Sequence, residues 1–337
     1  MGYSSLARCV KDLELTGQLR RIEVELDPYL EIAAVQRRAF AAKGPALLFT
    51  RVKGTPFPLL ANLYGTKERL EYIFREELPI VQKFFSAVGD GGREFFKHPF
   101  RHGFALLSLL GALLHMLPRH VDARGAAVLK EECSFDDLPK LVSWPKDGGA
   151  FITLPIVYSE DPLSPGFAHS NLGMYRIQLT GNAYREGELG LHYQIHRGLG
   201  VHHAHALAKG EALPVTLYVG GPPALSLASV MPLPEGVSEL RFAGLLQGEG
   251  VAFSKKAEEP LPILADADFC LSGTIGPVTK PEGPFGDHMG YYSLTHPFPV
   301  FTLKRISHRP NAIWPFTTVG RPPQEDTIFG DFIHEIT

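Results

Sequence analysis

Phe269-Cys-Leu-Ser-Gly-Thr-Ile275 is a short apolar run, and runs of this kind decide the fold of the second part of the chain. Similar runs occupy residues 151–158, 174–179, 189–195, 214–219 and 299–306. Glycine and proline clusters separate them, as in a β-barrel or a folded-over sheet. From about residue 121 the sequence therefore predicts a β-rich domain, with short helices near 204–209 and 223–229.

The first part of the chain alternates helical and extended patterns. Residues 5–15 are helix-like, and residues 19–26 alternate like a strand. Asp27-Pro28 looks like an N-cap followed by proline at the first helical position, which predicts a helix to about residue 42. The remaining predicted elements of this small α/β domain are strands at 46–52 and 58–64 and a helix capped by Thr66.

The boundaries between domains follow changes in composition. Residues 95–120 are basic around an apolar run and predict a linker helix, so the N-terminal domain spans 1–120. The β-rich domain spans 121–320. Residues 321–337 then form the start of a C-terminal segment, in which a new helix is expected to begin at His334.

Composition excludes several classes of protein. A length of 337 residues favours two domains, and a net charge of −3 gives no general affinity for nucleic acid. The three cysteines, Cys9, Cys133 and Cys270, are far apart, which argues for a reducing compartment and against a disulfide framework. The apolar run 104–117 is too short to span a bilayer, and the N-terminus has no signal segment. The sequence predicts a cytoplasmic protein.

Asn171-Leu-Gly-Met-Tyr-Arg176 is the first segment with candidate functional residues. Asn171 is expected in a turn and Arg176 on the following strand, where it shares a face with Met174. An inward-facing arginine requires a carboxylate or an anionic ligand. A structural salt bridge and a binding role both remain open.

Five histidines lie between positions 192 and 205. His192 and His196 are four apart on an expected strand, and no HExxH glutamate accompanies them, which argues against a zinc protease. His196 at the strand end is the better candidate for a single metal ligand. The remaining histidines, including His202, His203 and His205, are interpreted as packing or surface residues.

Two loops contain the remaining candidate functional residues. Residues 228–239, ASVMPLPEGVSE, form a rigid segment whose oxygens suit a hard cation, although such a segment is often only a loop. Glu282 and Asp287 lie five apart in PEGPFGDHMGYY, residues 281–292. Two carboxylates near an arginine allow one to stay ionised while the other carries a proton. A functional and a purely structural role are equally compatible with this loop.

Taken in order, the motifs resemble one family. NLGMYR, HR, ASVMPLPEGVSE, PEGPFGDHMGYY and TTVGRPPQED follow one another as in the UbiD-type decarboxylases, and LRRIEVELDPYLEI, KGPALLF and ANLYGTKERL are similar too. The resemblance covers nearly the whole chain. It implies an α+β fold: an N-terminal α/β domain, a flavin-binding split β-barrel domain, and a C-terminal domain that is missing or truncated.

The resemblance also implies a reversible, non-oxidative decarboxylase that uses prenylated FMN, with the cofactor phosphate held through Mn2+ (or another divalent metal) and K+. The divalent ion would be bound by Asn171, His196 and Glu239, and K+ by Glu239 with oxygens near Ala228, Ser229 and Met231. The implied cofactor contacts are Asn171, Gly173, Met174, Tyr175, Arg176, His196, Ser229, Met231 and Glu239.

In the catalytic set that the resemblance implies, Glu282 gives a proton to the carbon that loses CO2. Arg176 binds the substrate carboxylate, and Asp287 holds Arg176. The implied substrate is an aromatic or unsaturated carboxylic acid, with quinone biosynthesis as the leading context. The implied partners are a flavin prenyltransferase, other copies in a homo-oligomer and, since family members continue beyond this point, a polypeptide carrying the C-terminal domain. The alternative is a non-catalytic or partial flavin-binding subunit that needs this partner chain.

Overall fold

The first sheet of the computed structural model joins the two ends of the described chain. The structure describes residues 2–89, 111–196, 198–233, 237–255 and 258–336. Strands β1 (Leu19–Ile22), β2 (Ala46–Phe49) and β3 (Leu59–Ala61) lie in the order β1-β2-β3-β16, where β16 (Trp314–Pro315) comes from near the C-terminus. The N-terminal α/β unit is therefore completed by residues that follow the β-rich region.

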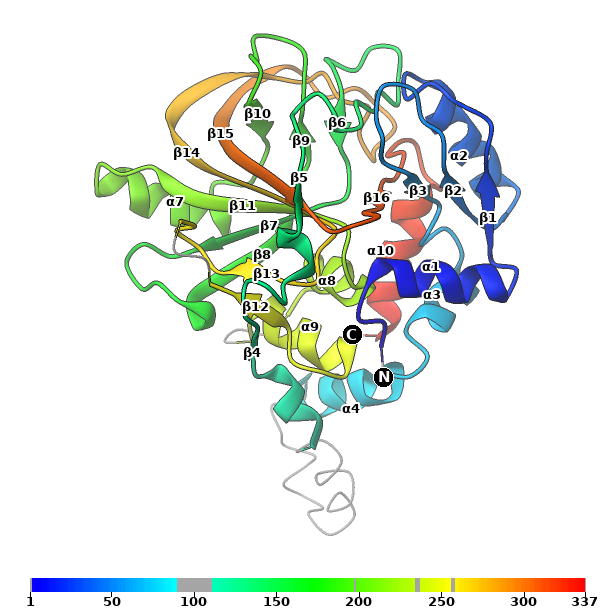
Figure 1. Cartoon of the computed structure of the whole chain (residues 1–337), viewed down its shortest axis with the longest axis horizontal. Helices are drawn as coiled ribbons and strands as arrows, with labels where there is room; N and C mark the ends of the chain where they lie inside the picture. The colour runs from blue at the N-terminus through cyan, green and yellow to red at the C-terminus, as the bar shows by residue number, and fades with distance from the viewer. Residues whose placement is uncertain (1, 90–110, 197, 234–236, 256–257, 337) are drawn as a thin grey trace.

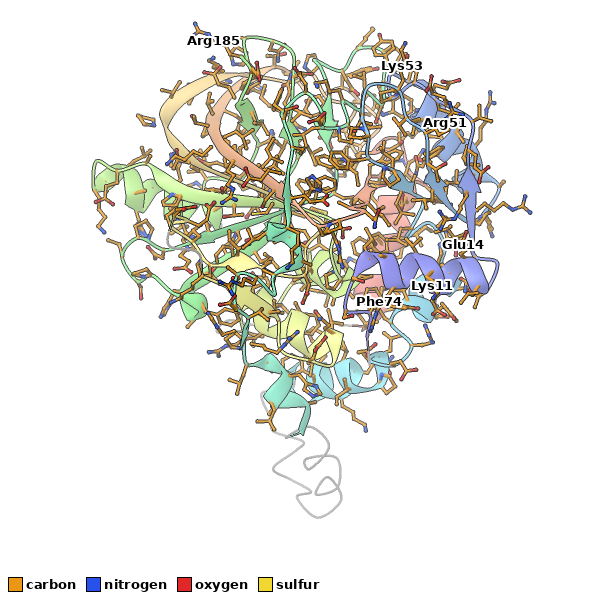
Figure 2. The ribbon with its side chains drawn as sticks, viewed as in Figure 1. Lys11, Glu14, Arg51, Lys53, Phe74 and Arg185 are labelled. Atoms are coloured by element: carbon orange, nitrogen blue, oxygen red, sulfur yellow. The ribbon has the colours of Figure 1, made fainter. Side chains whose placement is uncertain are left out.

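Two helices of this unit begin at polar caps, and the cap at Thr66 agrees with the prediction. The hydroxyl of Ser5 accepts from the Arg8 amide at the start of α1 (Leu6–Leu15), and Thr66 does the same for Arg69 at the start of α3 (Lys67–Ile73). Helix α1 buries the face formed by Leu6, Cys9, Val10 and Leu13. The side chains of Lys11 and Glu14 project from the helix (Figure 2).

The helix predicted from Asp27-Pro28 starts later, as α2 (Glu31–Ala41). The Asp27 carboxylate accepts from the Tyr29 amide at 2.8 Å, and Leu30 has a φ of 66°. This turn and the left-handed residue prevent helical geometry before Glu31. The predicted N-cap was therefore wrong.

Helix α10 (Glu325–Ile336) corrects the expectation that a helix begins at His334. It packs against α3 and α4 (Leu78–Gly89) (Figure 1). Phe329 of α10 stacks on Tyr64 with ring centroids 4.5 Å apart. The buried Glu325 carboxylate accepts from the Tyr64 amide at 2.7 Å and from the Gln36 side chain at 3.1 Å. The last turns of the chain are thus part of the N-terminal unit.

The β-rich region forms a large antiparallel sheet of nine described strands in the order β6-β9-β10-β15-β14-β11-β7-β8, with β5 beside β15. Figure 1 shows β14 and β15 as two long, curved neighbours. The described strands form an open path rather than a closed barrel. Their bounds are β5 (Glu131–Glu132), β6 (Phe151–Ile152), β7 (Pro155–Glu160), β8 (Ser170–Met174), β9 (Ile177–Gln178), β10 (Glu188–Leu191), β11 (Leu213–Val219), β14 (Phe269–Glu282) and β15 (His296–His308).

Alternation along the strands divides the core in two. On β7, Ile156 and Tyr158 enter one hydrophobic cluster, while Val157 between them enters the other. Helices α8 (Pro223–Ala228) and α9 (Glu239–Gln247) pack on each other, and many of their apolar side chains enter the first cluster. The sheet is therefore buried on both faces at its centre.

The remaining described elements are short. They are α7 (Leu199–Ala208), β4 (Arg119–His120), β12 (Ala252–Ser254), β13 (Ile263–Leu264) and the 3-10 turns Leu114–Met116, Ala127–Leu129 and Phe167–His169. Helix α7 starts five residues earlier than predicted, because His202 and His203 are buried and hydrogen-bonded in its first turns.

The expected linker helix at 95–120 and its apolar run 104–117 fall largely on residues 90–110, outside the described residues. In the part of the chain that the structure describes, no helix is long and apolar enough to cross a bilayer.

The packing of α10 can be tested with Phe332, which is 2% exposed and stacks on Phe74. Phe332→Ala should lower the free energy of unfolding by about 3–5 kcal/mol, because it leaves a cavity in a packed core. Denaturant unfolding measures the change. Asp331→Ala, at an exposed position of the same helix, is the control and should change it by less than about 0.5 kcal/mol. Equal effects of the two variants would contradict the docking of α10.

Candidate active site

A buried ion pair between Arg176 and Glu282 forms the centre of the site. Arg176 Nε donates to Glu282 Oε1 at 2.9 Å, and a terminal nitrogen of Arg176 donates to Oε2 at 2.8 Å. Glu282 is fully buried, and the Arg176 side chain is 13% exposed. Such a two-point contact fixes the position and the orientation of the guanidinium relative to the carboxylate.

The position of Arg176 differs from the prediction. Strand β8 ends at Met174 and β9 begins at Ile177, so Arg176 lies in the break between them rather than on a strand. Asn171 lies within β8 rather than in a turn. The break frees Arg176 from the alternation of the strand and lets its side chain reach the end of β14, where Glu282 is the last residue.

Further groups surround the guanidinium. Asp287 Oδ2 lies 3.7 Å from one terminal nitrogen of Arg176, and the other donates to the Ser293 hydroxyl at 3.2 Å. The Phe285 ring centroid lies 5.0 Å from the guanidinium carbon. The predicted Glu–Arg–Asp residues are therefore brought together, with Arg176 between the two carboxylates.

The loop after Glu282 is held by hydrogen bonds to neighbouring segments. The Gly283 amide donates to the Gln178 side chain at 2.8 Å, and its carbonyl accepts from Asn182 at 2.6 Å. The Gly286 amide donates to Asp147 at 2.9 Å. These contacts set the position of Asp287, which follows directly.

The pKa values of both carboxylates are lowered, but by different groups. Burial raises the pKa of Glu282, but hydrogen bonds from His192 and Arg176 outweigh it, so the net shift is downward. Burial also acts to raise the pKa of Asp287, but hydrogen bonds from the backbone and side chain of His288 outweigh it and lower this pKa too. Both groups are therefore ionised at neutral pH in this arrangement.

A cavity of about 860 Å³ lies beside the ion pair. Arg176, His192 and Asp287 line it, whereas Glu282 lies behind Arg176 and His192. The predicted cofactor contacts in its wall are Asn171, Gly173, Met174, Tyr175, Ser229, Met231 and Glu239. This one cavity thus brings together most of the predicted residues.

Two of the three predicted ligands of the divalent ion line the cavity. Asn171 and Glu239, the first residue of α9, both lie in the cavity wall, and burial raises the pKa of Glu239. His196 is exposed in the turn before α7 and is not among the described lining residues. Whether these three side chains bind one ion stays a prediction. Among the described residues, no group of three or more His, Cys, Asp or Glu is placed to hold a metal.

The proposed K+ ligands lie at the end of α8. Ala228 is its last residue and is fully buried, while Ser229 and Met231 reach the cavity. The Ser229 hydroxyl donates to the Ser226 carbonyl at 2.8 Å, so its lone pairs stay available. Residues 234–236 of the same motif lie outside the described residues.

His192 is the main residue that the sequence reasoning missed. It was interpreted as packing or surface, yet its Nδ1 lies 3.3 Å from Glu282 Oε2. The alternation of side chains along the strand could have indicated this role of His192. Leu189 and Leu191 face the core, so Gly190 and His192 lie on the opposite face of the strand. A side chain at Gly190 would collide with Tyr184 and press on Glu282, so glycine is required there.

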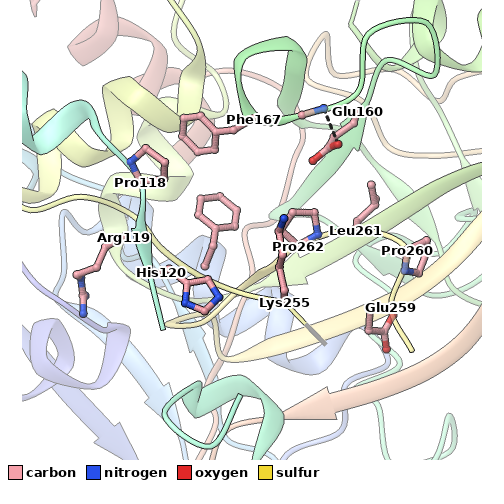
Figure 3. Close-up of a pocket in the computed structure, with 12 residues that line it drawn as sticks. Pro118, Arg119, His120, Glu160, Phe167, Lys255, Glu259, Pro260, Leu261 and Pro262 are labelled. Atoms are coloured by element: carbon pink, nitrogen blue, oxygen red, sulfur yellow. Dashed lines mark hydrogen bonds between the residues drawn. The ribbon is translucent and has the colours of Figure 1, made fainter. Parts of the chain in front are cut away.

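A second cavity, of about 560 Å³, lies near β4, β12 and the turn at Phe167 (Figure 3). Two of its charged residues have partners in the fold: Glu160 accepts from the Gly166 amide at 2.7 Å, and Arg119 pairs with Glu249 at 3.4 Å. None of the described residues predicted for the site lines this cavity. The larger cavity beside Arg176 is therefore the candidate active site.

Comparison with known families agrees with this location. Residues 119–322 match the 3-octaprenyl-4-hydroxybenzoate carboxy-lyase Rift-related domain, UbiD, and residues 10–88 match the corresponding N-terminal domain. A protein of Chlamydia muridarum is 42% identical over 342 residues, covering 98% of this chain and 56% of that protein. A 4-hydroxybenzoate decarboxylase subunit from Chlamydia pneumoniae is 41% identical over 335 residues, covering 98% and 55%. The chain thus spans about half the length of these relatives.

Solved structures share the fold. Vanillic acid decarboxylase of Sedimentibacter hydroxybenzoicus in its closed form has a TM-score of 0.83 at 23% identity, covering 98% of this chain and 67% of that one. An evolved dimeric form of the UbiD-class enzyme HmfF of Pelotomaculum thermopropionicum, in complex with prenylated FMN (prFMN), has a TM-score of 0.79 at 26% identity, covering 99% and 71%.

Breaking the central ion pair should destabilise the protein strongly. Arg176→Ala leaves the buried Glu282 carboxylate without its counter-charge and should cost about 3–5 kcal/mol of unfolding free energy in urea. Adding Glu282→Gln should recover part of this loss, because the stranded charge is removed. Arg21→Ala, in an exposed pair with Glu14, is the control and should cost about 1 kcal/mol or less. A double variant no more stable than Arg176→Ala would contradict the pairing.

The lowered carboxylate pKa values predict how stability depends on pH. A group whose pKa is lower in the folded than in the unfolded protein stabilises the fold at pH values above its unfolded pKa, which is about 4.3 for glutamate. This stabilisation is lost as the pH falls through the folded pKa. Wild-type stability should therefore fall below about pH 4.3. Glu282→Gln should show a shallower fall in the same window, measured as Tm between about pH 3 and 7. Parallel curves would mean that Glu282 does not titrate as described.

Proposed function

The chain belongs to the UbiD family of carboxy-lyases, and we propose that it removes CO2 from an aromatic or conjugated carboxylic acid with the help of prenylated FMN. The observation that carries the proposal is the buried Glu282 carboxylate held by Arg176 beside a cavity of about 860 Å³. A cationic group at the cavity wall with an acid behind it is suited to bind a carboxylate and protonate a neighbouring carbon.

The residues in the wall fit such a cofactor. Glu239 is a mostly buried carboxylate without a cationic side-chain partner among the described residues, and the amide of Asn171 lies in the same wall. Oxygen donors of this kind suit Mn2+, and K+ suits the oxygens of Ser229 and its neighbours, so the two ions would hold the cofactor phosphate. His196 would complete the divalent set. When bound, prenylated FMN supplies an electron sink for the carbon that loses CO2.

The protein's own groups divide the remaining work. Arg176 binds the substrate carboxylate, and Asp287 holds Arg176 in place. Glu282 gives a proton to the carbon after CO2 has left. Because its pKa is lowered in the structure, Glu282 must gain a proton during the cycle. A second anion at Arg176 favours this, since it weakens the hold of Arg176 on Glu282.

We place the substrate among hydroxybenzoate or naphthoate carboxylic acids of quinone biosynthesis, with other aromatic acids second. The Chlamydia pneumoniae relative, a 4-hydroxybenzoate decarboxylase subunit that is 41% identical to this chain, supports the choice. That relative is a subunit by name, so we also propose that the chain works in an assembly, either with copies of itself or with a further polypeptide. A flavin prenyltransferase would supply the cofactor.

The decisive experiment is an assay of CO2 release by protein co-expressed with a flavin prenyltransferase and supplied with Mn2+ and K+. It is run on this chain alone and on this chain joined to the further residues of its longer relatives. Glu282→Gln should bind flavin normally, as absorbance shows, but lose turnover by at least about 100-fold, because an amide cannot deliver the proton. Glu282→Asp should keep part of the activity.

Full turnover by a flavin-loaded Glu282→Gln variant would remove Glu282 from the mechanism. Absence of CO2 release by both wild-type forms with bound prenylated FMN, over a panel of aromatic acids, would refute the proposed activity.

A further inference from the structure

Decarboxylation consumes one proton per turnover, because R–COO⁻ and H⁺ become R–H and CO2. In the proposed function this proton leaves Glu282, whose carboxylate must then be protonated again. Glu282 has no exposure to solvent, and it is not among the residues that line the cavity. While Arg176 holds the carboxylate in this resting arrangement, its proton must therefore arrive through a neighbouring group.

Among the described residues, we consider the three polar side chains that interact with Glu282, namely Arg176, Tyr184 and His192, and two of them are unsuited to this task. Arg176 makes the two-point contact, but a guanidinium does not give up a proton in proteins. The Tyr184 hydroxyl is itself buried, without a hydrogen-bond partner among the described residues, and burial raises its pKa further. Neither group connects Glu282 with water.

His192 makes this connection. Its Nδ1 lies 3.3 Å from Glu282 Oε2, while its side chain is 35% exposed and lines the cavity. The ring stacks on Phe298 of β15, with centroids 4.0 Å apart and planes at 30°. The His192 amide also donates to the Arg176 carbonyl at 3.3 Å. The imidazole is thus held with one nitrogen toward the buried carboxylate.

We propose that His192 is a positioning residue that carries protons from solvent in the cavity to Glu282. This inference rests on the proposed function. The Nδ1–H bond breaks as the O–H bond on Glu282 forms, and the ring regains a proton from water. An imidazole suits this transfer because its two nitrogens can exchange protons on opposite sides near neutral pH. The charged groups around it are Glu282, Arg176 and, across the guanidinium, Asp287.

The test compares His192→Phe, which keeps a ring against Phe298, with His192→Ala, which leaves room for added imidazole. In the flavin-loaded enzyme, kcat of both variants should fall by about 100-fold while KM changes little. Imidazole in the buffer should restore part of the activity of His192→Ala but none of that of His192→Phe. His205→Phe is the matched control, because His205 is also 35% exposed and lies 2.9 Å from a carboxylate, that of Asp161.

A second readout needs no cofactor. The hydrogen bond from His192 helps to lower the pKa of Glu282, so removing it should raise that pKa. The difference in acid stability between wild type and Glu282→Gln should therefore shrink when both carry His192→Phe. A structural role for the ring would leave this difference unchanged.

The outcomes separate the two proposals. Wild-type turnover in His192→Phe, or a loss that imidazole does not restore with an unchanged Glu282 titration, overturns the role of His192 alone. A wild-type protein without turnover overturns the proposed function and this inference with it. A loss restored by imidazole, together with a shifted Glu282 titration, supports the proton path.

Discussion

The candidate site depends on a carboxylate that has no contact with water. A buried glutamate is stable in its charged form only if strong donors replace the lost solvent, and here Arg176 and His192 supply them. This requirement explains the surrounding architecture. Glu282 lies at the end of strand β14, and β8 ends before Arg176 so that the arginine side chain can reach it. Strand β10 has Gly190 beside Glu282, where a larger residue would come too close.

Much of this arrangement could be predicted from the sequence. An arginine in a β-rich region requires an anionic partner, and the carboxylates in the loop after residue 281 were identified as candidates. The strands of the large sheet, the cap at Thr66 and the helix near Pro223 were also located, because each has a short-range signal. Element ends were less accurate, since β14 and β15 continue well beyond their apolar runs as a twisted pair.

What the sequence could not indicate depends on contacts between distant segments. The start of α2 is set by a turn at Asp27, and the start of α10 is obscured because its first residue is a buried glutamate that binds Tyr64 and Gln36. Alternation along β10 could have indicated the face of His192, but not its contact with Glu282, which lies 90 positions away. The placement of His196 is similarly a matter of loop geometry, because it lies exposed in the turn before α7, outside the lining residues of the cavity.

Because the two carboxylates are buried to different extents, an anion that binds Arg176 affects Glu282 more than Asp287. Asp287 is one-third exposed and 3.7 Å away, whereas Glu282 is fully buried and in close two-point contact. An anion entering from the cavity must share the guanidinium with both. Asp287 can be screened by water, but Glu282 cannot, so the added negative charge acts mainly on Glu282 and favours its protonated form. Binding of an anionic substrate would in this way convert a resting carboxylate into an acid, and the stacked imidazole of His192 lies where the proton must enter.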